Sequence, residues 1–86
     1  MMTLERSLII PLYRSEEGIP HLFEALEKMQ EEKGFEVVFV DDGSPDHSRE
    51  MLLKMLPGVK WPWKFVSHAR NFGSFEAIRT GFANAS

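Results

Sequence analysis

Two short apolar segments, each followed by a helical pattern, constrain the fold of this chain most. Residues 7–12 and 35–40 are almost continuously hydrophobic, and neither segment alternates with polar residues. Such runs are typical of strands that are buried on both faces of a sheet. Between the two runs, apolar side chains recur at helical spacing, with glutamate and lysine on the other face and a glycine as a C-terminal stop. The residues of this pattern are Ile19, Leu22, Phe23, Leu26, Met29 and Gly34.

The alternation of strand and helix continues along the rest of the chain. A second helix is predicted before Pro57-Gly58, a third strand over residues 64–68, and a last helix after it despite a glycine in its interior. The units are about 30 residues long, as right-handed crossovers between parallel strands require. The sequence therefore predicts an α/β fold, a Rossmann-like parallel three-layer sandwich with the order β-α-β-α-β-α. The apolar faces of the two helices are Ser48, Met51, Leu52, Met55 and Leu56, and Phe75, Ile78, Phe82 and Ala85.

Length and charge exclude several classes of function. A chain of 86 residues is one small domain or part of a larger one. Its net charge of -3 gives no electrostatic basis for binding nucleic acid. The absence of cysteine excludes a disulfide framework and a thiolate metal site. The apolar run before Pro11 is too short for a signal-peptide core or a membrane span, so a soluble, cytoplasmic segment is expected.

The residues that follow the predicted strands are chemically unusual. In open parallel sheets, ligands bind beyond the carboxyl ends of the strands. An aromatic ring, carboxylates and a guanidinium at that edge can stack a base, accept hydrogen bonds from it and pair with phosphate. The first turn reads PLYRSEEG and lacks GxGxxG, so NAD binding is not expected. The candidate residues for binding a nucleotide are Pro11, Tyr13, Glu16, Glu17, Asp41, Asp42, Arg70 and Asn71.

The segment FVDDGSPD combines turn chemistry with a pair of acids. Gly43 favours a tight turn, and Ser44 followed by Pro45 is typical of an N-cap with proline at the first helical position. Turn chemistry explains at most one of Asp41 and Asp42, because adjacent like charges repel and aspartate is a poor strand residue. The other aspartate is a candidate for contact with a ligand.

Several of these residues also have a structural interpretation. Tyr13 could pack in its loop, and Arg70 could pair with either aspartate. The tryptophans at 61 and 63 could contact a membrane interface or a partner, but covering the core is the favoured interpretation. The histidines lie in different predicted elements, so no metal site is expected within the chain: His21, His47 and His68.

Three motifs, in this order, resemble those of the family 2 glycosyltransferases, which have the GT-A fold. They read PLYRSEE, VVFVDDGSPD and HARNFGSFEAIRTGF, and together they cover most of the chain. The RNFG sequence is similar to the branch that contains dolichyl-phosphate mannose synthases and bacterial undecaprenyl-phosphate glycosyltransferases. One departure is Arg14-Ser15, which replaces the asparagine that usually precedes the glutamates. The resemblance implies that residues 1–86 form a single nucleotide-binding subdomain, the first half of a GT-A catalytic domain.

The resemblance also implies roles for the candidate residues. The loop after the first strand would line the nucleotide base with Pro11, Tyr13 and either Glu16 or Glu17. The second aspartate of the acidic pair, Asp42, would accept a hydrogen bond from the uracil imide N–H.

The remaining candidates would shape the site and approach the diphosphate. Asp41 would support the turn and the ribose. Arg70 would approach the diphosphate, while Asn71 and Gly73 would form the tight turn before the last helix.

The implied activity needs residues beyond this chain. A longer parent would transfer a sugar from a UDP-sugar to an acceptor such as a polyprenyl phosphate, in cell-envelope polysaccharide synthesis at the cytoplasmic face of a membrane. Its divalent cation, Mg²⁺ or Mn²⁺, would bind a DxD motif beyond Ser86, where the acceptor site and catalytic base would also lie. The 86 residues alone would be inactive and would self-associate. The alternative is a non-catalytic nucleotide-binding or assembly module.

Overall fold

The computed structural model of the chain describes residues 2–3, 7–13, 16–32, 34–68 and 70–85. They form one four-stranded sheet in the order β1-β2-β3-β4. The pairings of β2 with β3 and of β3 with β4 are parallel, which confirms the α/β fold. The strands are β1 (Met2–Thr3), β2 (Ser7–Leu12), β3 (Glu36–Asp41) and β4 (Trp63–Ser67). The helices are α1 (Ile19–Glu32), α2 (Ser48–Met55), the short 3₁₀ helix η1 (Leu56–Gly58) and α3 (Ser74–Asn84).

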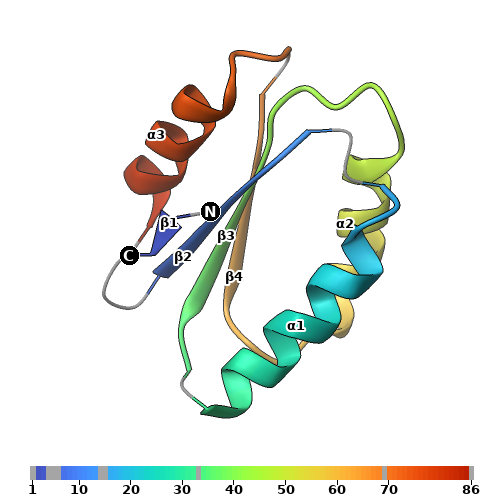
Figure 1. Ribbon diagram of the computed structural model, residues 1–86, viewed down its shortest axis with the longest axis vertical. Helices are drawn as coiled ribbons and strands as arrows, with labels where there is room; N and C mark the ends of the chain where they lie inside the picture. Colours follow the sequence, from blue (N-terminus) through green and yellow to red (C-terminus); the bar gives the residue numbers. More distant parts are fainter. Residues whose placement is uncertain (1, 4–6, 14–15, 33, 69, 86) are drawn as a thin grey trace.

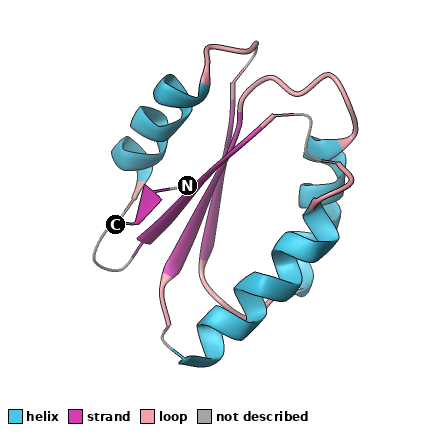
Figure 2. Cartoon of the chain, in the orientation of Figure 1, coloured by secondary structure: helices cyan, strands magenta, loops and turns pink. Residues whose placement is uncertain are grey.

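The elements form three layers, with α1 and α2 on one face of the sheet and α3 on the other (Figure 1). The central strand β3 is apolar throughout its middle because it is covered on both sides. Val37 and Phe39 belong to the larger core under α1 and α2. Val38 and Val40 belong to a smaller core that includes Ala77 of α3. The connections that leave the carboxyl ends of β2, β3 and β4 gather at one end of the sheet (Figure 2).

The first helix follows its predicted pattern closely, with one exception. Ile19, Phe23 and Leu26 are buried against the sheet, as the helical spacing predicts. Met29 was expected on the same face but is 39% exposed, because it lies near the end of the helix, beyond the buried residues. At this end Gln30 holds the next segment: its Nε2 donates to the Phe35 carbonyl (2.6 Å), and its Oε1 accepts from the Phe35 N–H (3.2 Å).

The second helix begins later than the sequence pattern indicates. Ser44 was expected to be the N-cap, but α2 starts at Ser48. His47 is at the N-cap position without a side-chain cap bond, and Asp46 Oδ1 instead accepts from the Ser48 N–H (3.1 Å) and the Ser48 hydroxyl (2.6 Å). A carboxylate is a stronger acceptor than a hydroxyl, and negative charge is favourable at a helix N-terminus.

Two features at the ends of the chain, the strand β1 and the close packing of α3, are not evident from the sequence pattern. The short strand β1 pairs antiparallel with β2 through Met2↔Ile9 and Thr3↔Leu8. Two residues are too few to show any periodicity in the sequence, so β1 was not predicted. In α3, a Cβ at Gly81 would lie 2.2 Å from Cγ2 of Ile9. This glycine therefore allows α3 to pack closely on β2, which explains its presence inside a helix.

The two tryptophans have different environments. Trp61 is buried, and its ring centroid lies 5.8 Å from that of Phe23 and 6.1 Å from that of Phe39. Its indole N–H donates to Glu27 Oε1 at 2.8 Å, which satisfies its polar group. The core interpretation is confirmed for Trp61, whereas Trp63 is 37% exposed on β4. Among the described residues, no helix is long and apolar enough to cross a bilayer.

Candidate functional site

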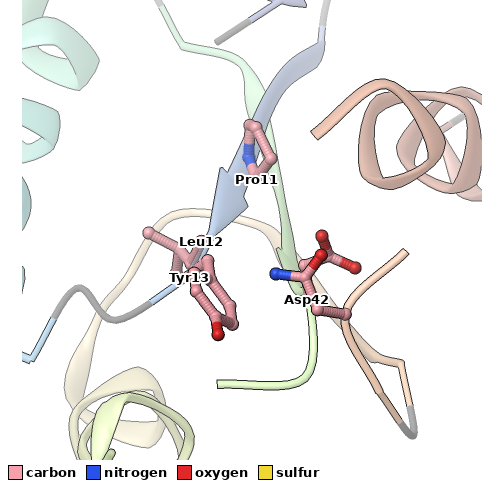
Figure 3. A pocket seen from close by; sticks show the side chains of 5 residues that line it. Pro11, Leu12, Tyr13 and Asp42 are labelled. Atoms are coloured by element: carbon pink, nitrogen blue, oxygen red, sulfur yellow. The ribbon is translucent and has the colours of Figure 1, made fainter. Parts of the chain in front are cut away.

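A pocket of about 270 Å³ lies at the carboxyl end of β2, beside the turn that follows β3. In Figure 3, Tyr13 and Asp42 lie on opposite sides of this space, with Pro11 at the end of β2 between them. Tyr13 is 42% exposed, so one part of its side chain faces the solvent rather than the core. The structure therefore brings together residues from three predicted segments: Pro11, Leu12, Tyr13, Asp42 and Asn71.

Asp42 is held by three donors. Its Oδ1 accepts from the Phe72 N–H (3.0 Å), and its Oδ2 accepts from the Gly73 N–H (2.9 Å). The Nδ1 of His68 lies 2.8 Å from Oδ1. Burial by itself raises the pKa of Asp42, but these hydrogen bonds and the nearby imidazole together lower it below its ordinary value of 3.8. Asp42 is therefore an ionised acceptor at neutral pH, although it is only 2% exposed.

The turn after β3 fits tightly against the loop before α3. Gly43 has a φ of +68°, a conformation that favours glycine. A Cβ at this position would lie 2.3 Å from the Arg70 carbonyl carbon and 2.5 Å from the Asn71 nitrogen. The predicted turn at 71–73 is present, because Asn71 Oδ1 accepts from the Gly73 N–H at 2.9 Å and Gly73 has a φ of +96°. These glycines permit the loop carrying Arg70 to lie beside Asp42.

Asp41 has a different environment from its neighbour. Its side chain is 2% exposed, and its Oδ1 has no hydrogen-bond partner among the described residues. Its backbone carbonyl accepts from the His68 N–H at 2.8 Å. Asp41 lines a separate cavity of about 310 Å³ together with Gly43, Ser44, Arg49, Ser67 and His68. The side-chain contacts that hold the turn to the 70–73 loop therefore come from Asp42, whereas Asp41 contributes through its backbone.

The two glutamates do not line the pocket with Tyr13. Glu17 is exposed. Glu16 joins the loop after β2 to the start of α2: its N–H donates to Asp46 Oδ2 (3.3 Å), and its Oε1 accepts from the His47 N–H (3.0 Å). The pKa of Asp46 is lowered, chiefly by the hydrogen bond from the Ser48 hydroxyl. Burial raises this pKa, but the N–H groups of Ser48 and Glu16 lower it further. Arg14 and Ser15 lie outside the described residues.

Arg70 and Phe72 flank Asn71, which lines the pocket. Arg70 is exposed, and its guanidinium carbon lies 5.0 Å from the centroid of the Phe72 ring. The pairing with Asp41 or Asp42, considered from the sequence, is not observed: within the described part of the chain Arg70 forms no ion pair. Its charge is thus available to an anion. The Phe72 ring is 49% exposed and also meets the edge of the His68 ring at 5.3 Å.

His68 also contacts Asp42, although sequence reasoning did not predict it as a site residue. It comes directly after β4, so its position at the carboxyl edge of the sheet was the available signal. Its ring connects Asp42 to Thr80 of α3, with Nε2 of His68 lying 2.8 Å from Thr80 Oγ1. The described residues contain no group of three or more His, Cys, Asp or Glu that could hold a metal ion.

Comparison with known proteins shows the family of the chain. Residues 7–86 match the family model described as glycosyl transferase family 2, so the chain belongs to that family. The undecaprenyl-phosphate 4-deoxy-4-formamido-L-arabinose transferase of Pseudomonas fluorescens (strain Pf0-1) is 37% identical over 78 residues, which cover 88% of this chain and 23% of the relative. The enzyme of that name from Proteus mirabilis (strain HI4320) is 36% identical over 91 residues, covering 99% of this chain and 28% of the relative.

A relative with a different name gives a similar match. The dolichol-phosphate mannosyltransferase of Pyrococcus furiosus is 32% identical over 80 residues, which cover 93% of this chain and 22% of that protein. The chain therefore spans about a quarter of the length of these curated relatives.

Proposed function

We propose that this chain is the nucleotide-binding first part of a longer glycosyltransferase that uses a UDP-sugar as donor and a polyprenyl phosphate as acceptor. The observation that carries the proposal is the pocket between Tyr13 and Asp42, with the exposed Arg70 next in sequence to Asn71, which lines it. It offers an aromatic face, an ionised acceptor and a cation within one edge of the sheet. The names of the relatives, which specify undecaprenyl phosphate and dolichol phosphate, support the choice of acceptor.

The base would bind between Tyr13 and Asp42. The phenol ring would stack on the base, and the Asp42 carboxylate would accept the imide N–H of uracil. Asp42 is suited to this role because its three protein donors hold it ionised and fixed in orientation. Each carboxylate oxygen can accept more than one hydrogen bond, so a ligand N–H can be added to these contacts.

The diphosphate would extend from the base toward the 70–73 loop. Arg70 would pair with it there, since this residue is exposed and its guanidinium lies over the Phe72 ring. A guanidinium suits phosphate because its donors form a planar fork. Asn71, which lines the pocket, would lie between the base and the diphosphate.

A divalent cation would assist departure of the diphosphate, but the described residues of this chain do not form its site. Asp41 and Asp42 are adjacent in sequence yet line different cavities, and the described residues contain no group of three or more His, Cys, Asp or Glu that could hold a metal ion. The metal ligands, the catalytic base and the acceptor site are therefore expected in the parent protein outside residues 1–86. A polyprenyl phosphate acceptor would place the parent at the cytoplasmic face of a membrane, in the synthesis of cell-envelope polysaccharide.

Calorimetric titration of the full-length parent with UDP tests the proposal. Asp42→Asn should weaken binding most, because a charge-assisted hydrogen bond contributes about 1.5–3 kcal/mol. Tyr13→Ala should be severe and Tyr13→Phe mild, since stacking of a base on an aromatic ring contributes about 1–3 kcal/mol. Glu24→Gln, at an exposed position of α1, is the matched control.

Three outcomes would change the assignment. Equal UDP affinity in wild type and Asp42→Asn would remove Asp42 from the base site. Tyr13→Phe and Tyr13→Ala of equal effect would show that the hydroxyl acts rather than the ring. Tight UDP binding by a full-length parent that transfers no sugar would favour a non-catalytic nucleotide-binding module.

A further inference from the structure

A chain of hydrogen bonds leads from the pocket into the packing of α3 on the sheet. It runs from Asp42 Oδ1 to His68 Nδ1, and from His68 Nε2 to Thr80 Oγ1, with 2.8 Å at each step. The His68 side chain is only 13% exposed, so protein atoms supply partners for both ring nitrogens. We propose that His68 is a positioning residue of the nucleotide site, which fixes the Asp42 carboxylate in the orientation that the base requires. This inference rests on the proposed function.

The state of Asp42 determines which ring nitrogen of His68 carries the proton. An ionised carboxylate can only accept, and hydrogen bonds keep the pKa of Asp42 low despite its burial. His68 Nδ1 must therefore be the donor to Asp42. In the neutral imidazole, Nε2 then has a lone pair and accepts from the Thr80 hydroxyl. The contacts thus assign the Nδ1–H tautomer to His68. A ring held by packing alone would favour neither tautomer.

His68 also acts on the loop that carries the phosphate-side cation. The N–H groups of Phe72 and Gly73 bind the same carboxylate that His68 holds. The His68 ring edge contacts the Phe72 ring at 5.3 Å, and the guanidinium of Arg70 lies over that ring at 5.0 Å. One imidazole therefore connects the acceptor for the base, the 70–73 loop and the helix behind them. Without the imidazole, the Asp42 carboxylate would lose its contact on the side of α3 but would keep its two backbone donors.

Substitutions at His68 separate positioning from packing. His68→Asn keeps a short donor near the place of Nδ1, His68→Gln reaches toward Thr80, and His68→Phe keeps only the ring. Thr80→Ser retains the hydroxyl, whereas Thr80→Val removes it at nearly constant size. His21→Asn, at an exposed position on α1, is the control.

We expect the affinity of the full-length parent for UDP to fall about tenfold in His68→Phe and His68→Gln, because one charge-assisted hydrogen bond is lost. In His68→Asn the affinity should be within about threefold of wild type. Thr80→Ser should bind as wild type does, and Thr80→Val about threefold more weakly. Wild-type affinity in His68→Phe would overturn the inference, as would a His68→Asn protein as weak as His68→Phe.

The imidazole nitrogen chemical shifts of His68 provide a test that does not need a variant to fold. When the ring is neutral, the Nδ1–H tautomer is expected, and a predominant Nε2–H tautomer would refute the inference. The proposed function fails separately, if the wild-type parent binds neither UDP nor another nucleotide. Weak binding by Asp42→Asn together with unchanged binding by every His68 variant would leave the function standing and remove His68 from it.

Discussion

The adjacent aspartates offer a matched pair of substitutions with opposite expected effects on stability. Asp42→Asn leaves one acceptor oxygen where two now receive three donors. If the amide oxygen takes the place of Oδ1, the bonds from Phe72 and His68 become neutral. Charged hydrogen bonds contribute about 1.5–3 kcal/mol and neutral ones about 0.5–1.5, so this change costs on the order of 1–3 kcal/mol.

The remaining donor adds to the cost. The amide NH₂ would face the Gly73 N–H, which keeps one acceptor because it also donates to Asn71 Oδ1. This partial compensation limits the additional loss to about 1 kcal/mol. The expected decrease in the free energy of unfolding is therefore about 2–4 kcal/mol, a large part of the stability of a domain this small.

Asp41→Asn should have little effect or should stabilise the fold. The Asp41 carboxylate is buried, and its Oδ1 has no partner among the described residues. A buried carboxylate oxygen without a hydrogen bond carries a desolvation cost, which a neutral amide reduces. Urea denaturation of the 86-residue chain at one low concentration, followed by circular dichroism, measures both variants. A larger loss for Asp41→Asn than for Asp42→Asn would refute this account of the acidic pair.

The pH dependence of stability follows from the same contacts. The folded-state pKa of Asp42 lies below its ordinary value of 3.8, so the unfolded chain binds more protons in this range. The contribution of Asp42 is therefore complete above that ordinary value and is lost as pH falls through the lower, folded-state pKa. Asp46 contributes in the same direction. Asp42→Asn should have a flatter stability profile below about pH 4 than wild type, and an unchanged acid profile would contradict this.

Three further predictions concern backbone approach and association. Gly43→Ala should destabilise the fold by more than about 2 kcal/mol, because Gly43 has a positive φ and its Cβ would lie 2.3 Å from Arg70. Gly58→Ala, which has open space around its Cβ, should not destabilise the fold. Equal urea midpoints for the two variants would contradict this prediction. Gly81→Ala should destabilise the fold despite a helix-propensity gain of about 1 kcal/mol, because its Cβ would lie 2.2 Å from Cγ2 of Ile9. In a double-mutant cycle, adding Ile9→Ala should recover part of the lost stability. Additive losses would show that this close approach is unimportant. The 86-residue chain should sediment as a dimer or larger, since β4 is an edge strand and Phe72 and Phe82 are 49% and 43% exposed. Phe82→Glu should reduce this association. A monomer at all concentrations would contradict the prediction.

The sequence alone determined the order of elements and the edge at which the site lies. Hydrophobic runs and helical spacing are local signals, so β2, β3, α1 and α3 begin within a residue or two of their predicted positions. Parallel pairing follows from the length of the crossovers, and the carboxyl edge follows from parallel pairing. Pro11, Tyr13, Asp42 and Asn71 could therefore be predicted to meet in one place.

Only the tertiary structure decided what each polar side chain does at that edge. Glu16 contacts the start of α2, where its Oε1 accepts from the N–H of His47, 31 residues along the chain. Asp46, rather than Ser44, accepts from the first N–H of that helix, which lies two residues away. Asp41 and Asp42 are the same type of residue, yet successive side chains at a strand end point to opposite faces. Asp42 therefore contacts His68 and the 70–73 loop, while Asp41 lines a separate cavity. Such contacts depend on partners brought together by folding, and no local pattern records them.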